Sequence, residues 1–475
     1  MRNTVAILGI PIDDLNTEQV MERLDEFVAS QRFHQVATAN TDFLIQGLDD
    51  PELKAILWTV DLVVPDGMPI VLASKWLDAP LKERVTGADL VPMLAQRAAQ
   101  KGYKIFMLGG KPENAQKAKL WMEKENPGLQ IVGCSSPAPS HIVTMDNEKI
   151  LAEIEAAQPD ILLVAFGNPK QEKWIHMHRD RLNVPVCIGV GGTFDFLAGA
   201  TVRAPEWMQK SGFEWLHRLC QEPKRLWRRY MRDIVHFARF ITLQLWVMRR
   251  RKRTQGKARV ADITLGDCTV ISLVGSLDSK QLAKFQAKAE HALNLPSHLV
   301  LDLQNTTDMD SAILGTLLNL PKRAAFVGRE VRLVGVPSHL KSVLKISQAQ
   351  SRLRVYQTFT DALRGQLPET LEVRTTLRGS LAALVLDGAA NEENRPYLEL
   401  HLRQLPNFLD HVELDMREVD FLDIGTLALL HRFAEERKKF GCDVSLMPGE
   451  AVGRLLAREK LTTAFDVVSS LSKAA

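Results

Sequence analysis

VATANTD, at residues 36–42, and VPDGMP, at residues 64–69, decide the fold class of this chain. Each stretch places small polar groups and a carboxylate directly after a run of apolar, β-branched residues. In an open α/β sheet such positions are the carboxyl ends of strands, where ligands bind. Asp66, followed by Gly67 and expected near Thr38 and Asn40, is therefore predicted to lie where a carboxylate can take a proton from a substrate hydroxyl.

Similar apolar runs recur along residues 1–205, and all but the first end in a small or polar residue. They are VAILGI (5–10), HQVATAN (34–40), LVVPDG (62–67), KIFMLGG (104–110), LQIVGC (129–134), DILLVAFG (160–167) and VPVCIGVGG (184–192). Helical patterns lie between them, for example at residues 17–30, 88–101 and 114–125. Short, nearly continuous apolar runs alternating with helices predict parallel βαβ units with both faces of the sheet covered.

The bulk composition is that of an ordinary globular protein. The chain has 475 residues, a net charge of +3 and five cysteines with no CxxC pair. An odd, scattered set of cysteines argues against a disulfide framework and a structural zinc site. The amino-terminal apolar run is cut by Asp13 and Asp14, which favours a first strand over a signal peptide. No apolar stretch is long enough to span a bilayer.

A basic helical appendage and linker is predicted over residues 206–257. Between Arg218 and Arg253 there are twelve lysines and arginines but only two acids, Glu222 and Asp233. On a helical wheel one apolar stripe opposes the arginines, which predicts an amphipathic helix or helix pair. The stripe consists of Leu219, Leu226, Tyr230, Ile234, Phe237, Ile241, Leu245 and Met248.

The carboxyl-terminal half contains an internal duplication. LVLDLQNTTDMDSAILGTLL begins at Leu299 and VELDMREVDFLDIGTLALL begins at Val412, and matched positions share one offset of 113 residues. This predicts two copies of one domain, at residues 258–368 and 369–475. Two copies of this size are too few and too large for a solenoid.

The amino-terminal half resembles the WecG/TagA/CpsF family of bacterial glycosyltransferases. The similar stretches occur in order: TANTDF (38–43), VPDGMP (64–69), RVTGADL (84–90), FMLGG (106–110), FGNPKQE (166–172), GVGGTFDFLAG (189–199), RAPEWMQ (203–209) and EWLHRLCQEPKRLWRRY (214–230). The resemblance implies a Rossmann-like transferase domain over residues 1–205. It also implies transfer from a UDP-sugar, of the N-acetylmannosamine or glucose type, to a polyprenyl-pyrophosphate-linked acceptor in cell-surface or exopolysaccharide synthesis.

The same resemblance implies inversion at the anomeric carbon without a metal or other cofactor, with Asp66 as the general base. Thr38 and Asn40 match family positions lining the same pocket. Arg84 is a candidate to bind a phosphate, and a solvated surface arginine is the alternative. The predicted donor site comprises Gly109, Gly110, Phe166, Gly167, Pro169, Lys170, Gln171, Gly191 and Asp195. Glycine-rich turns before helices suit phosphates, but helix capping by Asn40 and Asp195 is an alternative to ligand binding.

With no metal expected, cationic side chains must stabilise the departing UDP. Arg218, Arg225 and Arg228 match family arginines that serve this purpose; the alternative is a solvated basic face. The appendage, ending in RRRKR at residues 249–253, is also expected to lie on the inner leaflet of the cytoplasmic membrane. The alternative is a helix packed on the protein core. The expected location is thus peripheral, on the cytoplasmic face, and no nucleic acid is expected as a partner.

The duplicated domain resembles the STAS domain of anti-sigma-factor antagonists. This implies a protein partner and a possible phosphorylation site at Ser311, for which a simple helix N-cap is the alternative. The second copy has Ile424 at that position and is degenerate in this respect. A different overall function also fits: a catalytically silent scaffold that acts through its STAS domains as an interaction or phospho-switch module.

Overall fold

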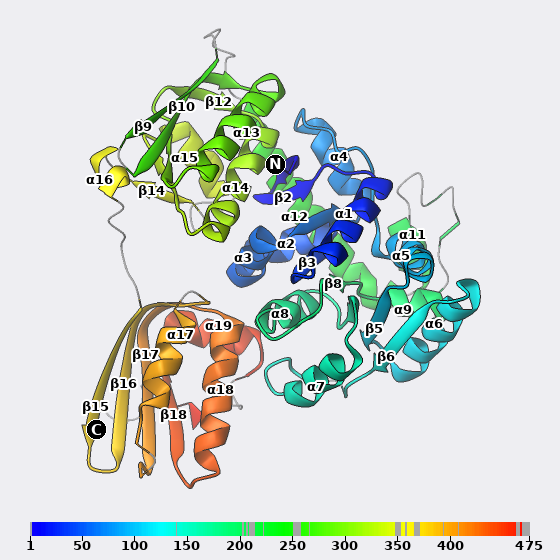
Figure 1. The fold of residues 1–475 in the computed structure, drawn as a ribbon, viewed down its shortest axis with the longest axis vertical. Coiled ribbons are helices and arrows are strands. Elements are labelled where there is room, and N and C mark those ends of the chain that lie inside the picture. The colour runs from blue at the N-terminus through cyan, green and yellow to red at the C-terminus, as the bar shows by residue number, and fades with distance from the viewer. Residues whose placement is uncertain are drawn as a thin grey trace. The chain divides into compact units, whose positions relative to one another are not determined.

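The computed structural model describes residues 2–467 with gaps at 139, 202–203, 206–207, 209–213, 222, 250–257, 266, 347–352, 357–358, 365–370, 393, 407 and 462–465 (Figure 1). The chain forms two compact units. One consists of Met1–Ala138 and Glu148–Gln366, and the other of Pro139–Asn147 and Leu367–Ala475. The first unit therefore holds both the transferase-like region and the first duplicated domain.

The transferase-like region is built on a six-stranded parallel sheet. Its strand order is β4-β3-β8-β7-β5-β6, as the alternating apolar runs predict. The strands are β3 (His34–Ala39), β4 (Leu62–Pro65), β5 (Lys104–Gly109), β6 (Gln130–Ser135), β7 (Ile161–Ala165) and β8 (Val186–Gly189). The first helices between them are α1 (Thr17–Ser30), α2 (Thr41–Asp49), α3 (Pro51–Thr59), α4 (Met68–Trp76), α5 (Gly87–Lys101) and α6 (Pro112–Glu125), followed by α7 (Asn147–Ala157), α8 (Lys170–Met177) and α9 (Thr193–Leu197).

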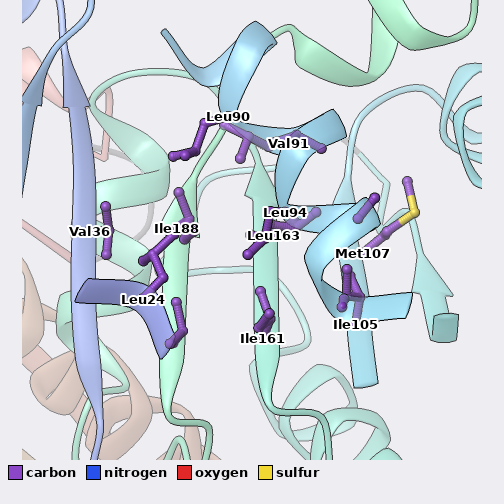
Figure 2. Close-up of a cluster of buried hydrophobic side chains, with 14 of the residues drawn as sticks. Leu24, Val36, Leu90, Val91, Leu94, Ile105, Met107, Ile161, Leu163 and Ile188 are labelled. Atoms are coloured by element: carbon purple, nitrogen blue, oxygen red, sulfur yellow. The ribbon is translucent and has the colours of Figure 1, made fainter. Parts of the chain in front are cut away.

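Both faces of this sheet are buried because successive side chains of a strand point in opposite directions. On one face Val36 and Ile188 pack against Leu24 of α1 and Leu90 and Leu94 of α5 (Figure 2). The other face contributes Ala37, Ala39 and Val63 to a cluster with α2, α3 and α4. The two layers hold the strand ends, and hence the site, in fixed register.

The first apolar run does not enter the parallel sheet, so that part of the prediction is wrong. Residues Thr4–Ile7 (β1) pair antiparallel with Ile10–Asp13 (β2) in a separate two-stranded hairpin. The connecting residues Leu8 and Gly9 have φ values of 50° and 79°. A two-residue turn with positive φ at both positions matches the twist of an antiparallel pair.

The appendage is a helix pair, α11 (Glu214–Gln221) and α12 (Pro223–Arg249). Phe237 and Ile241 are buried in the cluster that also contains the hairpin. Ile234, expected on the same apolar stripe, is instead 45% exposed. The predicted single stripe is therefore divided: part of it packs on the protein and part faces solvent. No described helix has the length and apolar character needed to cross a bilayer.

The strands of the two duplicated domains are arranged in a similar way. In the first, the order is β12-β10-β11-β13-β14, with β9 antiparallel to β10; in the second, it is β15-β16-β17-β18-β19. The first contains β9 (Arg259–Leu265), β10 (Cys268–Leu277), α13 (Ser279–Asn294), β11 (His298–Asp302), β12 (Thr306–Met309), α14 (Ser311–Phe326), β13 (Val331–Val334), α15 (Ser338–Ile346), β14 (Arg354–Tyr356) and α16 (Phe359–Arg364).

The second contains β15 (Glu372–Arg378), β16 (Leu381–Ala390), α17 (Arg395–Arg403), β17 (His411–Leu422), α18 (Ile424–Lys438), β18 (Asp443–Pro448), α19 (Glu450–Arg458) and β19 (Asp466–Val467). An aspartate caps the equivalent helix in both, Asp310 before α14 and Asp423 before α18. This equivalence agrees with the constant sequence offset.

Candidate active site

The predicted base lies at the carboxyl end of β4, next to the carboxyl end of β3. Ala39 and Pro65 are register partners, so Asn40 and Asp66 each follow directly after paired residues. The Asp66 N–H donates to the Ala39 carbonyl oxygen at 2.8 Å. Asp66 is partly exposed, and Gly67 then leads into α4. The carboxylate is thus anchored through its backbone at the mouth of the sheet.

Thr38 and Asn40 both make local hydrogen bonds. The Thr38 hydroxyl donates to the Gly189 carbonyl oxygen at 3.2 Å, which ties β3 to the end of β8. The Asn40 side chain accepts from the Phe43 N–H at 3.1 Å and is the N-cap of α2. An amide that caps through its oxygen still has two N–H donors, so capping and ligand binding are compatible at Asn40.

Gln171 connects two of the predicted donor-site turns. Its side-chain oxygen accepts from the N–H of Gly167 at 3.1 Å and from the N–H of Gly191 at 3.0 Å. Gln171 is buried, and its amide nitrogen donates to Glu172 at 2.9 Å. In this arrangement Gln171 shapes the site by holding the turns after β7 and β8 together. Lys170 is the first, exposed residue of α8.

Burial changes the chemistry of Glu172, beneath these turns. Desolvation raises the pKa of Glu172 to about 8, although the Gln171 hydrogen bond opposes the shift. The carboxyl group is therefore neutral near pH 7. Beside it, Lys173 pairs with Asp50 at 2.8 Å and Glu52 at 3.0 Å in a buried ion cluster. These contacts join α8 to the start of α3.

The turn after β7 contains Phe166, Gly167 and Pro169, and the Asn168–Pro169 peptide is cis. Gly109, after β5, has φ +95°, and a Cβ there would lie 2.8 Å from Phe166. The Gly110 N–H donates to the Ala165 carbonyl oxygen at 3.0 Å. The glycines thus permit close packing of neighbouring strand ends, so the turns of β5 and β7 belong to one edge.

Asp195 and Arg84 both have protein partners near this edge. Asp195, in the first turn of α9, accepts from Asn114 of α6 at 2.6 Å. Arg84 pairs with Glu214 of α11 at 3.0 Å and approaches Asp89 at 4.0 Å. Arg84 therefore connects the loop before α5 to the appendage.

The three arginines expected to stabilise the leaving group lie on the two appendage helices. Arg218 is on α11, and Arg225 and Arg228 are on α12. Their side chains lie outside the described part of the chain. The neighbouring Arg232 is described, and its guanidinium approaches Asp42 of α2 at 3.7 Å. The first half of α12 therefore reaches the helix that follows the Thr38–Asn40 strand end.

Asp42, Asn168 and Arg232 are polar site-edge residues that sequence reasoning did not select. The Asp42 carboxylate is buried and accepts from Asn168 at 3.3 Å and from Gln46 at 2.6 Å. Asp42 lies within the VATANTD stretch and Asn168 within FGNPKQE, so the signal was present. Asp42 contacts both Asn168 and Arg232, and these contacts depend on packing between segments far apart in the chain.

Ser311, the predicted phosphorylation position, is the first residue of α14 and is fully buried, with 0% of its surface exposed. Asp310 caps this helix, and burial raises the pKa of Asp310 to about 6 against hydrogen bonds from the Ile313 and Ala312 N–H groups. A kinase could reach Ser311 only after this region opens. Phosphorylation at Ser311 stays a prediction.

Among the described residues, no cluster of three His, Cys, Asp or Glu side chains is placed to hold a metal ion. Metal-independent transfer stays a prediction. The fold and the site together define an α/β enzyme domain whose polar and glycine-rich turns gather at the carboxyl edge of a parallel sheet.

Comparison with known proteins identifies the class. The family model described as "Glycosyl transferase WecG/TagA/CpsF family" matches residues 5–252, and the model "Mlab, STAS domain" matches residues 262–354. The chain belongs to the WecG/TagA/CpsF glycosyltransferase family and carries a STAS domain behind the transferase domain. Both predicted resemblances are confirmed.

Three curated relatives share one description, N-acetylglucosaminyldiphosphoundecaprenol N-acetyl-β-D-mannosaminyltransferase. The protein from Bacillus spizizenii is 32% identical over 41% of this chain and 74% of its own length. The Bacillus subtilis protein is 30% identical over 48% and 87%, and that of Staphylococcus aureus (MRSA252) is 30% identical over 47% and 87%. A Thermotoga maritima structure described as an anti-sigma factor antagonist covers 22% of this chain and 92% of its own at 19% identity, with a TM-score of 0.21.

Proposed function

We propose that this protein transfers a sugar from a UDP-sugar to a polyprenyl-diphosphate-linked acceptor at the cytoplasmic face of the membrane, with inversion and without a metal. The placement of Asp66 beside Asn40 and Thr38 at adjoining strand ends carries the proposal. The relatives' description favours a sugar of the N-acetylmannosamine type and an acceptor ending in N-acetylglucosamine.

In the proposed reaction the acceptor hydroxyl attacks the anomeric carbon in a single displacement. The Asp66 carboxylate takes the hydroxyl proton as the new C–O bond forms, which requires an approach to about 3 Å. The bond from the anomeric carbon to the UDP oxygen breaks, and the electron pair leaves with UDP. Cations aimed at the developing charge stabilise it, a role we assign to the appendage arginines Arg218, Arg225 and Arg228, with Arg84.

The solvent-facing side of α12 supports a membrane-bound acceptor. Trp227, Met231, Val235 and Trp246 are 55%, 41%, 56% and 54% exposed, and Arg232 and Arg239 are exposed nearby. A helix that exposes tryptophans and arginines suits the boundary between headgroups and acyl chains. Phe237 and Ile241 fix its other side on the transferase domain, so a lipid-linked substrate at this surface would lie near the site.

Replacing the base tests the mechanism. Asp66→Asn keeps the shape of the side chain but removes its basicity, so turnover should fall by about 10²–10⁴-fold while donor binding persists. UDP release measured with N-acetylglucosaminyl-diphosphoundecaprenol and UDP-N-acetylmannosamine reports turnover. Thermal stabilisation by UDP reports binding.

The exposed Asp49 on α2 provides the matched control, and Asp49→Asn should retain wild-type turnover. Unchanged turnover in Asp66→Asn would refute the base assignment. If the folded wild-type protein neither releases UDP from any of a panel of UDP-sugars with this acceptor nor is stabilised by them, the catalytically silent scaffold becomes the better interpretation.

A further inference from the structure

The β1–β2 hairpin has two buried faces with different neighbours. Val5 and Ile7 lie in the transferase cluster with Phe43 of α2 and Ile241 of α12. Thr4 and Ala6 alternate with them and point the other way. Ala6 lies in the hydrophobic core of the first STAS domain, with Leu314 and Leu317 of α14. The hairpin is thus shared by two domains.

Polar contacts fix the same interface. Asn319 of α14 donates to the Thr4 hydroxyl at 2.8 Å, and both residues are buried. Lys322, one turn further along α14, pairs with Asp61 at 2.5 Å. Burial acts to raise the pKa of Asp61, but its contacts with His34, at 3.6 Å, and with Lys322 outweigh burial and lower this pKa to about 2. The buried Asn319–Thr4 hydrogen bond and the partly exposed Lys322–Asp61 ion pair together favour one docking geometry.

Gly315 permits this approach. A Cβ at Gly315 would lie 2.6 Å from the Thr4 carbonyl oxygen and 2.9 Å from the Thr4 hydroxyl. The obstructing atoms include β1 backbone, which cannot rotate away as a side chain can. Glycine otherwise weakens a helix interior by about 1 kcal/mol relative to alanine. Its presence in α14 therefore fits a requirement for close contact.

The duplicated domain serves as an internal comparison. At the offset of 113 residues, Gly315, Asn319 and Lys322 correspond to Ala428, Arg432 and Glu435. The second copy thus has a side chain in place of the glycine, a bulky cation in place of the amide and an acid in place of the lysine. Its α18 lacks the two features that dock α14 on the hairpin and the lysine that pairs α14 with Asp61.

The hairpin also contacts helix α12 of the basic appendage. Gln244 of α12 is buried, accepts from the Leu8 N–H at 3.0 Å and donates to the Ala6 carbonyl oxygen at 3.1 Å. Helix α12 also contacts α15 of the first STAS domain. The first STAS domain thus supports α12 directly and through the hairpin.

We propose that the α14 face of the first STAS domain has this chain's own β1–β2 hairpin as its partner, and that this docking positions helix α12 for glycosyl transfer. The first STAS domain is accordingly a built-in positioning module of the transferase. A separate protein partner must use another face or the second copy. The effect on transfer rests on the proposed function, whereas the docking itself does not.

Gly315→Ala in the full chain tests the docking. Alanine favours the helix, so the circular dichroism spectrum should be retained. Its Cβ blocks the approach of β1. Amide hydrogen exchange should accelerate in residues 4–13 and 237–245, and UDP release in the assay above should fall several-fold. Gly453→Ala in α19 is the matched control, because a Cβ there meets no atom within 4 Å.

Asn319→Ala provides a second, milder variant in case Gly315→Ala does not fold. It should accelerate exchange in the same two segments, whereas Arg432→Ala in the second copy should not. Unchanged exchange in residues 4–13 in a folded Gly315→Ala protein would overturn the docking. Accelerated exchange with full UDP release would overturn the positioning of α12. Absence of UDP release in the wild type would refute only the proposed function.

Discussion

Gln171 and Glu172 form a buried pair that supports the turns of the candidate active site. The Gln171 amide joins the Gly167 and Gly191 turns, and its nitrogen end meets the Glu172 carboxyl group. Interpreting Gln171 as a ligand-binding side chain rested on motif position. The structure shows an additional reason for glutamine here, because its amide oxygen accepts from two N–H groups while its amide nitrogen donates to a carboxyl oxygen.

The buried Glu172 should make stability depend on pH. Its pKa is about 8 in the folded protein, against the ordinary glutamate value of 4.5 expected for the unfolded chain. Between these values the unfolded state loses a proton that the folded state keeps, so stability falls as pH rises, by at most about 1.4 kcal/mol per pH unit. Glu172→Gln keeps an acceptor for Gln171 but cannot ionise. Thermal unfolding between pH 5 and 9 should show a gain over wild type that grows with pH.

Glu155→Gln, at an exposed position of α7, is the control and should leave the pH profile of the melting temperature unchanged. An identical profile for Glu172→Gln and wild type would mean that Glu172 ionises freely in the folded protein.

At the scale of one element, α12 combines three tasks around its axis. Phe237, Ile241 and Gln244 face the protein, Trp227 and Trp246 face solvent, and Arg232 reaches Asp42. Periodicity alone predicted an amphipathic helix correctly. It could not tell which apolar residues pack on the domain, because both sets recur at helical spacing.

Removing the exposed aromatics should weaken membrane binding without unfolding the helix. The double variant Trp227→Ser/Trp246→Ser loses two large apolar side chains, each worth about 1.5–3 kcal/mol when buried. Sedimentation with vesicles containing phosphatidylglycerol should show at least tenfold weaker binding than wild type. Binding should also fall with added salt, because the arginines contribute.

Phe326→Ser, an aromatic of α14 with 76% exposure, is the matched control and should bind vesicles as wild type does. Equal vesicle binding by the double tryptophan variant would remove α12 as the membrane contact.

At the scale of the whole molecule, the candidate active site and the second duplicated domain belong to different compact units. All described candidate site residues from Thr38 to Arg232 lie in the first unit, and residues 367–475 lie in the second. Deleting residues 367–475 should therefore preserve UDP release, because a compact unit with its own core can fold alone. UDP release reports the activity of the truncated protein, and the first unfolding transition reports whether it is folded.

Complete loss of UDP release in a folded truncation of residues 367–475 would show that the second unit takes part in transfer. That conclusion would be supported if only the full-length protein released UDP. Retained activity would leave the second domain available for a separate regulatory or docking role.

Much of this organisation was determined by the sequence itself. The six runs of the parallel sheet, the glycine-rich turns, the family and the duplication all follow from local periodicity, motif order and a constant offset, which depend on residues near one another in the chain. Asp66 and Asn40 were predicted together because parallel strand ends share one edge of a sheet.

Only the tertiary structure decided which buried surfaces meet. Val5, Ala6 and Ile7 form an apolar run that suits a central strand as well as a hairpin, and their sequence does not specify a partner. The contact between Thr4 and Asn319 joins residues 315 positions apart. The need for a glycine at position 315 of α14 becomes evident only from the approach of β1 at this contact. Such contacts depend on the complementarity of two folded surfaces, which no local pattern in either segment contains.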